Sequence, residues 1–229
     1  MKKVLKIIGY VFLALVLFLL AFYFIKNESL PDGERSLNAD YMAAKMTTAL
    51  NKQAWDSTKT VSWTFRGTND YIWDRIENKV NVKWGEIEVS LDPETITGDV
   101  KVDGKILEGN EAQSLIKKAW DNFNNDSFWL CAPFKVFDPG VERSIITLGD
   151  GREGLMVTYS SGGTTPGDTY VWILGEDNKP TSVKMWVSIL PIGGMEFTWE
   201  NYKTLPSGAL LAQNHQLYGL INLEIGGIE

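Results

Sequence analysis

The chain has 229 residues, a formal net charge of −7, one cysteine, Cys131, and one histidine, His215. Four of its 22 basic residues and none of its 29 acidic residues precede residue 27, so the remainder has 18 basic residues and a charge of −11. This acidic balance argues against a nucleic-acid partner, because phosphate neutralisation needs the opposite charge. A lone cysteine excludes an intramolecular disulfide and, with one histidine, does not make a zinc site. We expect no cofactor and no metal.

The first 26 residues predict a membrane anchor. An uncharged run of 19 residues, Ile7–Ile25, lies between three lysines and Lys26 and contains no proline. As a helix it would be about 28 Å long, close to the hydrocarbon thickness of a bilayer. A cleaved secretory signal is the alternative, but the segment Ala21–Glu28 contains no small-residue cleavage site, and no cysteine follows it for lipid attachment.

The flanking charges predict the orientation of this anchor. Lysines before the apolar run keep the N-terminal side in the cytoplasm, which places residues 27–229 outside it. We therefore expect a single-pass protein of the inner (cytoplasmic) membrane with a periplasmic or otherwise extracytoplasmic domain. Residues 27–37 read as a polar linker, and residues 38–229 as one domain.

Two amphipathic helices are predicted in this domain. The first begins at Asn38 and carries apolar residues at helical spacing as far as Leu50. The second begins at Asn110 and has apolar residues at i, i+3, i+4, i+7, i+8 and i+11 from Ala112 onward. Its predicted end is the polar segment Asn124–Asp126.

The rest of the domain predicts strands separated by turns rich in Gly, Asn and Asp. The strands expected between the two helices are Val61–Phe65, Tyr71–Trp73, Lys79–Trp84, Glu86–Leu91 and Val100–Val102. Those expected after the second helix are Ser144–Leu148, Leu155–Tyr159, Thr169–Leu174, Ser182–Leu190, Met195–Tyr202, Leu210–Ala212 and Gly219–Ile225. A large antiparallel sheet must curl, and its apolar concave face must be covered. The predicted fold class is α+β, mainly antiparallel β: a strongly curved sheet or unclosed β-barrel with helices covering the mouth, preceded by one transmembrane helix.

Several patterns mimic functional sites. Gly149–Gly154 matches the dinucleotide-binding fingerprint, but a strand rather than a helix follows it, which indicates a hairpin turn. Asp121–Asp126 is rich in oxygen ligands but lacks the glycine and the spacing of a calcium loop. Glu86 and Glu88 share one strand face, as expected of a water-facing surface. Neither the cysteine nor the histidine has a local catalytic partner, so we expect no catalytic residues and no enzyme.

The density of aromatic residues is the strongest functional signal. The chain has nine Trp, eight Tyr and ten Phe, and every tryptophan follows the apolar segment. Large aromatic surfaces on a concave sheet line pockets for apolar ligands, although a filled aromatic core would use the same residues. The residues that we expect to line a ligand cavity are Trp63, Phe65, Tyr71, Trp73, Trp84, Trp120, Trp172, Trp186 and Trp199.

The order of elements over residues 38–225 resembles the LolA/LolB-like lipoprotein carrier and receptor fold, an unclosed antiparallel barrel with helices as a lid over an apolar cavity. The segments that also resemble bacterial envelope proteins of this type are Phe128–Lys135, Val136–Gly140, Ser160–Asp168 and Lys184–Val187. The carrier is soluble and the receptor is lipid-anchored, whereas this chain has a predicted transmembrane helix. A tethered binder of acyl chains therefore fits better than a shuttle. Ile189–Gly194 would then be an apolar loop tip touching membrane or ligand, or a hairpin tucked into the barrel end.

The sequence alone does not decide between two functions. The first is a membrane-anchored, non-catalytic extracytoplasmic protein that binds lipid, an acyl chain or a lipoprotein. It predicts a connected apolar cavity beneath the helix at residues 110–124. The second is a structural or protein-interaction module of the cell envelope with a fully packed barrel, an exposed apolar patch and an unknown protein partner. An enzyme such as a hydrolase would need converging polar groups with shifted pKa, for which the sequence shows no candidate set.

Overall fold

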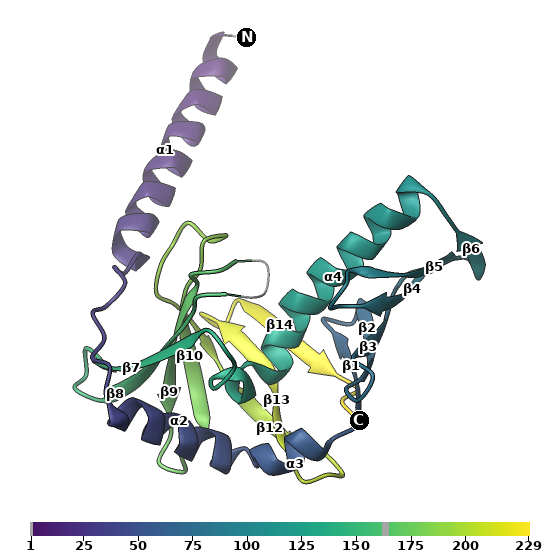
Figure 1. Ribbon diagram of the computed structural model, residues 1–229. Helices are drawn as coiled ribbons and strands as arrows, with labels where there is room; N and C mark the ends of the chain where they lie inside the picture. Colours follow the sequence, from purple (N-terminus) through teal and green to yellow (C-terminus); the bar gives the residue numbers. More distant parts are fainter. Residues whose placement is uncertain (1, 162–164) are drawn as a thin grey trace.

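The first element of the chain, α1 (Lys2–Lys26), stands clear of the rest of the protein (Figure 1). The computed structural model describes residues 2–161 and 165–229. Within those residues, α1 is the one helix long and apolar enough to cross a membrane, with its span at Lys6–Lys26. No part of that span is buried against the domain, so its apolar side chains are free to face lipid.

Over its described residues, the domain that follows contains three further α-helices, a short 3₁₀ helix and fourteen strands. The helices are α2 (Leu37–Ala49), α3 (Lys52–Ser57), α4 (Asn110–Cys131) and η1 (Ala132–Lys135). The strands before α4 are β1 (Thr60–Phe65), β2 (Asn69–Asp74), β3 (Lys79–Trp84), β4 (Ile87–Asp92), β5 (Thr97–Val102) and β6 (Lys105–Leu107). The strands after it are β7 (Val141–Thr147), β8 (Glu153–Tyr159), β9 (Thr169–Leu174), β10 (Pro180–Trp186), β11 (Met195–Thr198), β12 (Glu200–Thr204), β13 (Leu210–Leu217) and β14 (Ile221–Gly226).

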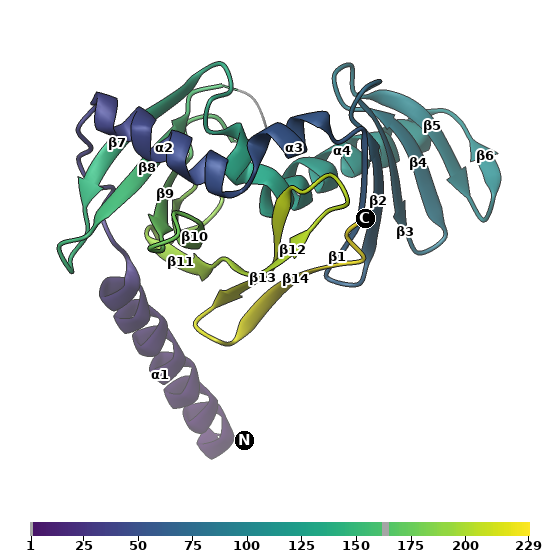
Figure 2. The ribbon, with the colours of Figure 1, turned by 90° about the horizontal axis from the view of Figure 1, so that it is seen from below.

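All fourteen strands belong to one antiparallel sheet that does not close. Its order is β6-β5-β4-β3-β2-β1-β14-β13-β11-β10-β9-β8-β7, with β12 paired to β13 outside this path. The two halves meet where β1 pairs with β14 through Thr64–Gly226 and Phe65–Ile225. Ser62 and Glu229 extend this short junction by exchanging backbone hydrogen bonds of 2.9 and 3.0 Å. The C-terminal strand therefore joins the two meanders into one curved sheet (Figure 2).

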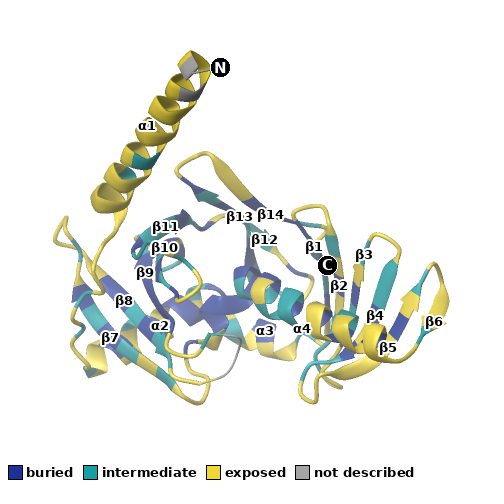
Figure 3. Ribbon diagram, turned by 90° about the horizontal axis from the view of Figure 1, so that it is seen from above, coloured by how far each residue is buried: buried dark blue, intermediate teal, exposed yellow. Residues whose placement is uncertain are grey.

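The helices cover the concave face of this sheet. Along its length α4 packs against β4, β5 and β13, while α2 packs against β7 and β8. Figure 3 shows α1 exposed along nearly its whole length, whereas α4 carries both buried and exposed residues. An unclosed antiparallel barrel with helices in its mouth is the architecture predicted from the sequence, and this prediction is confirmed.

Aromatic stacking holds α4 against the first meander. Phe123, on the buried side of α4, lies 6.3 Å from the rings of both Trp63 and Tyr71 and 5.3 Å from the ring of Trp73. Trp63 and Tyr71 stack on each other at 4.6 Å, directly opposite one another on β1 and β2. Such aromatic contacts stabilise packing beyond the area that they bury.

The predicted end of the second helix is wrong. The helix continues through Asn124–Asp126 to Cys131, because Asp126 is buried and its carboxylate is bonded on the inner face. It accepts hydrogen bonds from the Asn69 amide at 2.9 Å and the Tyr71 hydroxyl at 2.6 Å. A tertiary contact between α4 and β2 therefore overrides a local helix-stop signal.

Several strand boundaries also differ from the prediction, among them two in the segment Ser182–Tyr202. The strand expected to reach Leu190 ends at Trp186, and a loop follows it up to β11. The strand expected over Met195–Tyr202 is interrupted at Trp199, whose side chain is buried and whose N–H donates to Thr181 at 2.7 Å. The predicted hairpin turn at Gly149–Gly154 is confirmed between β7 and β8. The turn expected at Ser161–Asp168 lies partly outside the described residues.

We predict that Phe123→Ala destabilises the domain by about 3–5 kcal/mol, because it removes the ring that joins α4 to three aromatic side chains. Urea unfolding followed by tryptophan fluorescence measures this change. Asp121→Ala on the exposed side of the same helix removes only an ion pair with Lys117 and should cost about 0.5 kcal/mol or less. Equal losses in the two variants would contradict the packing role of Phe123.

Candidate functional site

A cavity of about 650 Å³ lies between the second meander and the C-terminal half of α4. Its walls come from β8 to β11, from β13 and β14, from residues 124–129 of α4, and from the loop that follows β10. Phe65 and Arg66 contribute from the end of β1, so the junction of the two half-sheets also borders it. This volume is in the range of small-molecule binding pockets.

Most of the cavity wall is apolar. The apolar side chains that line it include Phe65, Phe128, Trp129, Tyr170, Met185, Met195, Phe197 and Leu223. Phe128 lies 4.6 Å from the ring of Tyr170, and Trp129 lies 4.8 Å from the ring of Phe197. These contacts join α4 to β9 and β11 of the second meander, so the helix both covers the sheet and forms one wall of the cavity.

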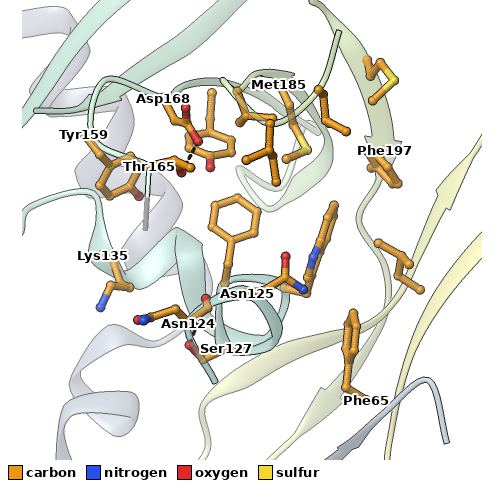
Figure 4. A pocket seen from close by; sticks show the side chains of 18 of the residues that line it. Phe65, Asn124, Asn125, Ser127, Lys135, Tyr159, Thr165, Asp168, Met185 and Phe197 are labelled. Atoms are coloured by element: carbon orange, nitrogen blue, oxygen red, sulfur yellow. Dashed lines mark hydrogen bonds between the residues drawn. The ribbon is translucent and has the colours of Figure 1, made fainter. Parts of the chain in front are cut away.

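Polar groups gather on one side of the cavity. Figure 4 shows Asn124, Lys135 and Tyr159 there, with the Lys135 ammonium 3.5 Å from the Asp138 carboxylate. The Asn124 amide nitrogen and the Tyr159 hydroxyl are buried and have no hydrogen-bond partner among residues 2–161 and 165–229. Burial raises the pKa of Tyr159, which keeps its hydroxyl neutral and able to donate.

Unpaired buried donors are uncommon, because each one left without an acceptor costs free energy. Two such donors lie near a lysine in a cavity whose walls are mostly apolar, which would suit a ligand with an apolar chain and an acceptor-rich polar end.

Of the nine aromatic residues expected to line a cavity, Phe65 borders this one. Trp63 and Tyr71 pack beneath α4 in the first meander. Trp73 lies between Phe123 and the guanidinium of Arg75, which is 5.4 Å from its ring. These residues form a packed aromatic core beside the cavity.

The other five aromatic residues that were expected to line a cavity lie at separate places in the fold. Trp172 and Trp199 are buried and meet edge to face at 4.9 Å. Trp120 donates from its indole to the Pro93 carbonyl at 3.1 Å, and Lys118 lies 5.3 Å from the ring of Trp84. Trp186 borders a smaller hollow near the loop after β10 and donates to the backbone of the linker.

The sequence prediction missed the residues of α4 that form the cavity wall. Phe128 and Trp129 belong to an apolar run that was placed after the end of the helix. Helical spacing from Phe123 would have placed only Leu130, at i+7, on the same face, because Phe128 and Trp129, at i+5 and i+6, point to other sides of the helix. The true helix end lies at Cys131, whose thiol is buried with a raised pKa, as desolvation disfavours the thiolate.

A buried polar cluster supports the floor of the cavity. Asp126 accepts hydrogen bonds from Asn69, Tyr71 and Asn125, the last at 2.8 Å. Burial raises the pKa of Asp126, against the opposing effect of these three donors. Because Asn124 and Asn125 line the cavity, this cluster positions the polar side of the site.

The histidine is a structural group behind the same wall. The ring of His215 lies 3.8 Å from that of Trp199 and 5.3 Å from that of Trp129. Burial lowers the pKa of His215 to about 3, so it is neutral at physiological pH. Among the residues described, no cluster of three or more His, Cys, Asp and Glu side chains could hold a metal ion.

Comparison with known proteins yields only distant likenesses. No protein-family model and no curated protein matches the chain. A DUF1329 family protein from Desulfovibrio piger is similar over 86% of this chain and 93% of its own, with 7% identity and a TM-score of 0.37. A LolA superfamily protein from Nitrosomonas europaea is similar over 80% of this chain and 92% of its own, with 9% identity and a TM-score of 0.34.

We predict that acid destabilises the protein through its one histidine. The folded pKa of about 3 is below the unfolded value of about 6.5, so stability is complete above pH 6.5 and falls as the pH is lowered. The slope approaches about 1.4 kcal/mol per pH unit below pH 6.5. His215→Phe should remove this pH dependence of the free energy of unfolding. Urea unfolding between pH 7 and pH 5 measures the change, because ordinary carboxylates titrate below this range. Parallel pH profiles for the two proteins would contradict the assignment.

Proposed function

We propose that this protein is a membrane-anchored, non-catalytic binding protein that holds a lipid, an acyl chain or the acyl group of a lipoprotein. The observation that carries the proposal is the 650 Å³ cavity with apolar walls and two unpaired donors on one side. Apolar walls favour an alkyl chain through the area that they remove from water, and the donors favour an ester, amide or phosphate oxygen.

In this proposal α1 holds the domain on the extracytoplasmic face of the cytoplasmic membrane. Support comes from the unburied span at Lys6–Lys26 and from the lysines that precede its apolar core. The alternative of a packed interaction module requires a filled barrel. The open volume beside α4 favours the binding function over that alternative.

We predict that the full-length protein purified from membranes carries lipid or an acylated peptide, detected by native mass spectrometry and identified after extraction. Met195→Asp should lower the occupancy at least about tenfold, because an unpaired carboxylate in the apolar wall is costly to desolvate. Met156→Asp is the matched control, since Met156 is half-buried on β8 outside the cavity. A wild-type protein that is free of lipid and takes up no added lipid or acylated peptide would refute the proposal.

We predict opposite effects for two tyrosines. Tyr159→Phe removes an unpaired hydroxyl, so it should leave the stability of the empty protein unchanged or higher while weakening ligand binding about three- to tenfold. Tyr202→Phe removes a hydroxyl that donates to Pro180 at 2.8 Å, so it should cost about 1 kcal/mol of stability without weakening binding. Thermal unfolding and ligand titration measure both properties. If Tyr159→Phe binds as tightly as wild type, its hydroxyl has no role in binding.

A further inference from the structure

We infer that the mouth of the cavity rests on the bilayer that holds α1, with two apolar loop tips in the lipid, so that ligand passes into the cavity directly from that leaflet. The inference deepens the proposed function and rests on it for the nature of the ligand. The first tip, called here the β10–β11 tip, is Val187–Gly194. The second, called the β13–β14 tip, is Tyr218–Ile221.

The end of α1 is bonded directly to the β10–β11 tip. The Glu28 backbone N–H donates to the Gly193 carbonyl at 2.9 Å, and the Gly193 N–H donates to the Asn27 side chain at 2.8 Å. Trp186 donates from its indole to the Glu28 carbonyl at 2.9 Å, and Lys184 pairs with the Glu28 carboxylate at 2.8 Å. A side chain at Gly193 would meet Trp186 and Glu28 within 2.6–2.7 Å, so this close contact requires glycine.

The β13–β14 tip is also adjacent to the end of α1. The Lys26 ammonium lies 4.8 Å from the centre of the Tyr218 ring. Lys26 is the last residue of the membrane span, and lysine and tyrosine are both typical of the bilayer interface. Figure 2 shows α1 and this hairpin projecting from the same side of the domain, and Figure 3 shows the same from the opposite direction.

Each tip presents exposed apolar side chains. Leu220 is 88% exposed and Ile189 is 69% exposed. Ile189 lines the cavity and so does Ile221, so the two tips lie on the border of its mouth. A single exposed leucine is ordinary on a protein surface, but two apolar tips that flank one cavity and lie against the end of a membrane helix form a surface suited to lipid.

Charge supports a bilayer as the occupant of this surface. Neither Val187–Gly194 nor Tyr218–Ile221 contains a charged residue, although the domain as a whole carries −11. Contact with lipid would therefore depend on apolar insertion and hardly on salt, unlike the attachment of a basic patch to anionic headgroups. The attachment of α1 places these tips at the depth of Lys26 without any conformational change.

Depth-dependent quenching tests the docking itself. The full-length protein, with Cys131→Ala and one new cysteine, is labelled with an environment-sensitive fluorophore and placed in phosphatidylcholine nanodiscs that contain nitroxide-labelled lipid. Ile189→Cys and Leu220→Cys should be quenched. Ile106→Cys is the matched control, because Ile106 is a 74% exposed apolar residue on β6, far from the tips. Equal quenching at all three sites, or none at residues 189 and 220, would overturn the inference and leave the tips to a protein partner.

Uptake kinetics separate this inference from the proposed function. Leu220→Asp should slow uptake of a pyrene-labelled phospholipid from the nanodisc at least about tenfold, given the free energy of burying one leucine. It should leave unchanged the affinity for a short-chain phospholipid supplied below its micelle concentration, because Leu220 does not line the cavity. Ile106→Asp should change neither. Failure of wild type to bind either lipid refutes the proposed function, whereas normal binding with unslowed uptake in Leu220→Asp overturns the membrane route alone.

Discussion

The contact between α4 and the concave face of the sheet is the constraint on which the rest of the structure depends. The two half-sheets share only a short ladder between β1 and β14, so strand pairing alone holds them weakly together. Phe123 packs into the first half-sheet, and Phe128 and Trp129 pack into the second. One helix thus fixes the angle between the halves, and the space that it does not fill is the cavity.

A polar interaction sets the position of that helix. The Asp126 carboxylate is buried at a cost, which three hydrogen bonds offset. Apolar contacts alone would tolerate a slide of α4 along the sheet, because they have little directional preference. The bonds to Asn69 and Tyr71 define one register, and that register places Asn124 at the polar side of the cavity. Buried polar groups of this kind contribute specificity more than stability.

The linker between membrane and domain is short and is bonded to the domain near both of its ends. Glu28 pairs with Lys184, and Glu34 forms a two-way backbone bridge with Ile145 on β7. The residues after α1 therefore follow the edge of the second half-sheet and do not act as a free tether. Because the cavity belongs to that same half-sheet, its mouth and the membrane helix have a defined spatial relation.

Periodicity and composition alone were enough to predict much of the fold. Strict alternation in Lys79–Trp84 predicted β3 at its observed bounds, and the uninterrupted apolar run before Lys26 predicted α1. Local patterns succeed in such cases because each residue's environment follows from its immediate neighbours. The same reasoning predicted an unclosed barrel, since so many antiparallel strands must curl and be covered.

The location of the cavity was decided only by the tertiary structure. Aromatic residues such as Trp63 and Phe128 look equivalent in sequence, yet the first packs in the core and the second lines the cavity. The end of α4 depended on a carboxylate that finds its donors 55 and 57 residues away. A strand pattern shows which face of the strand is apolar, but not which part of the protein packs against that face. That depends on long-range packing, which no local window of sequence contains.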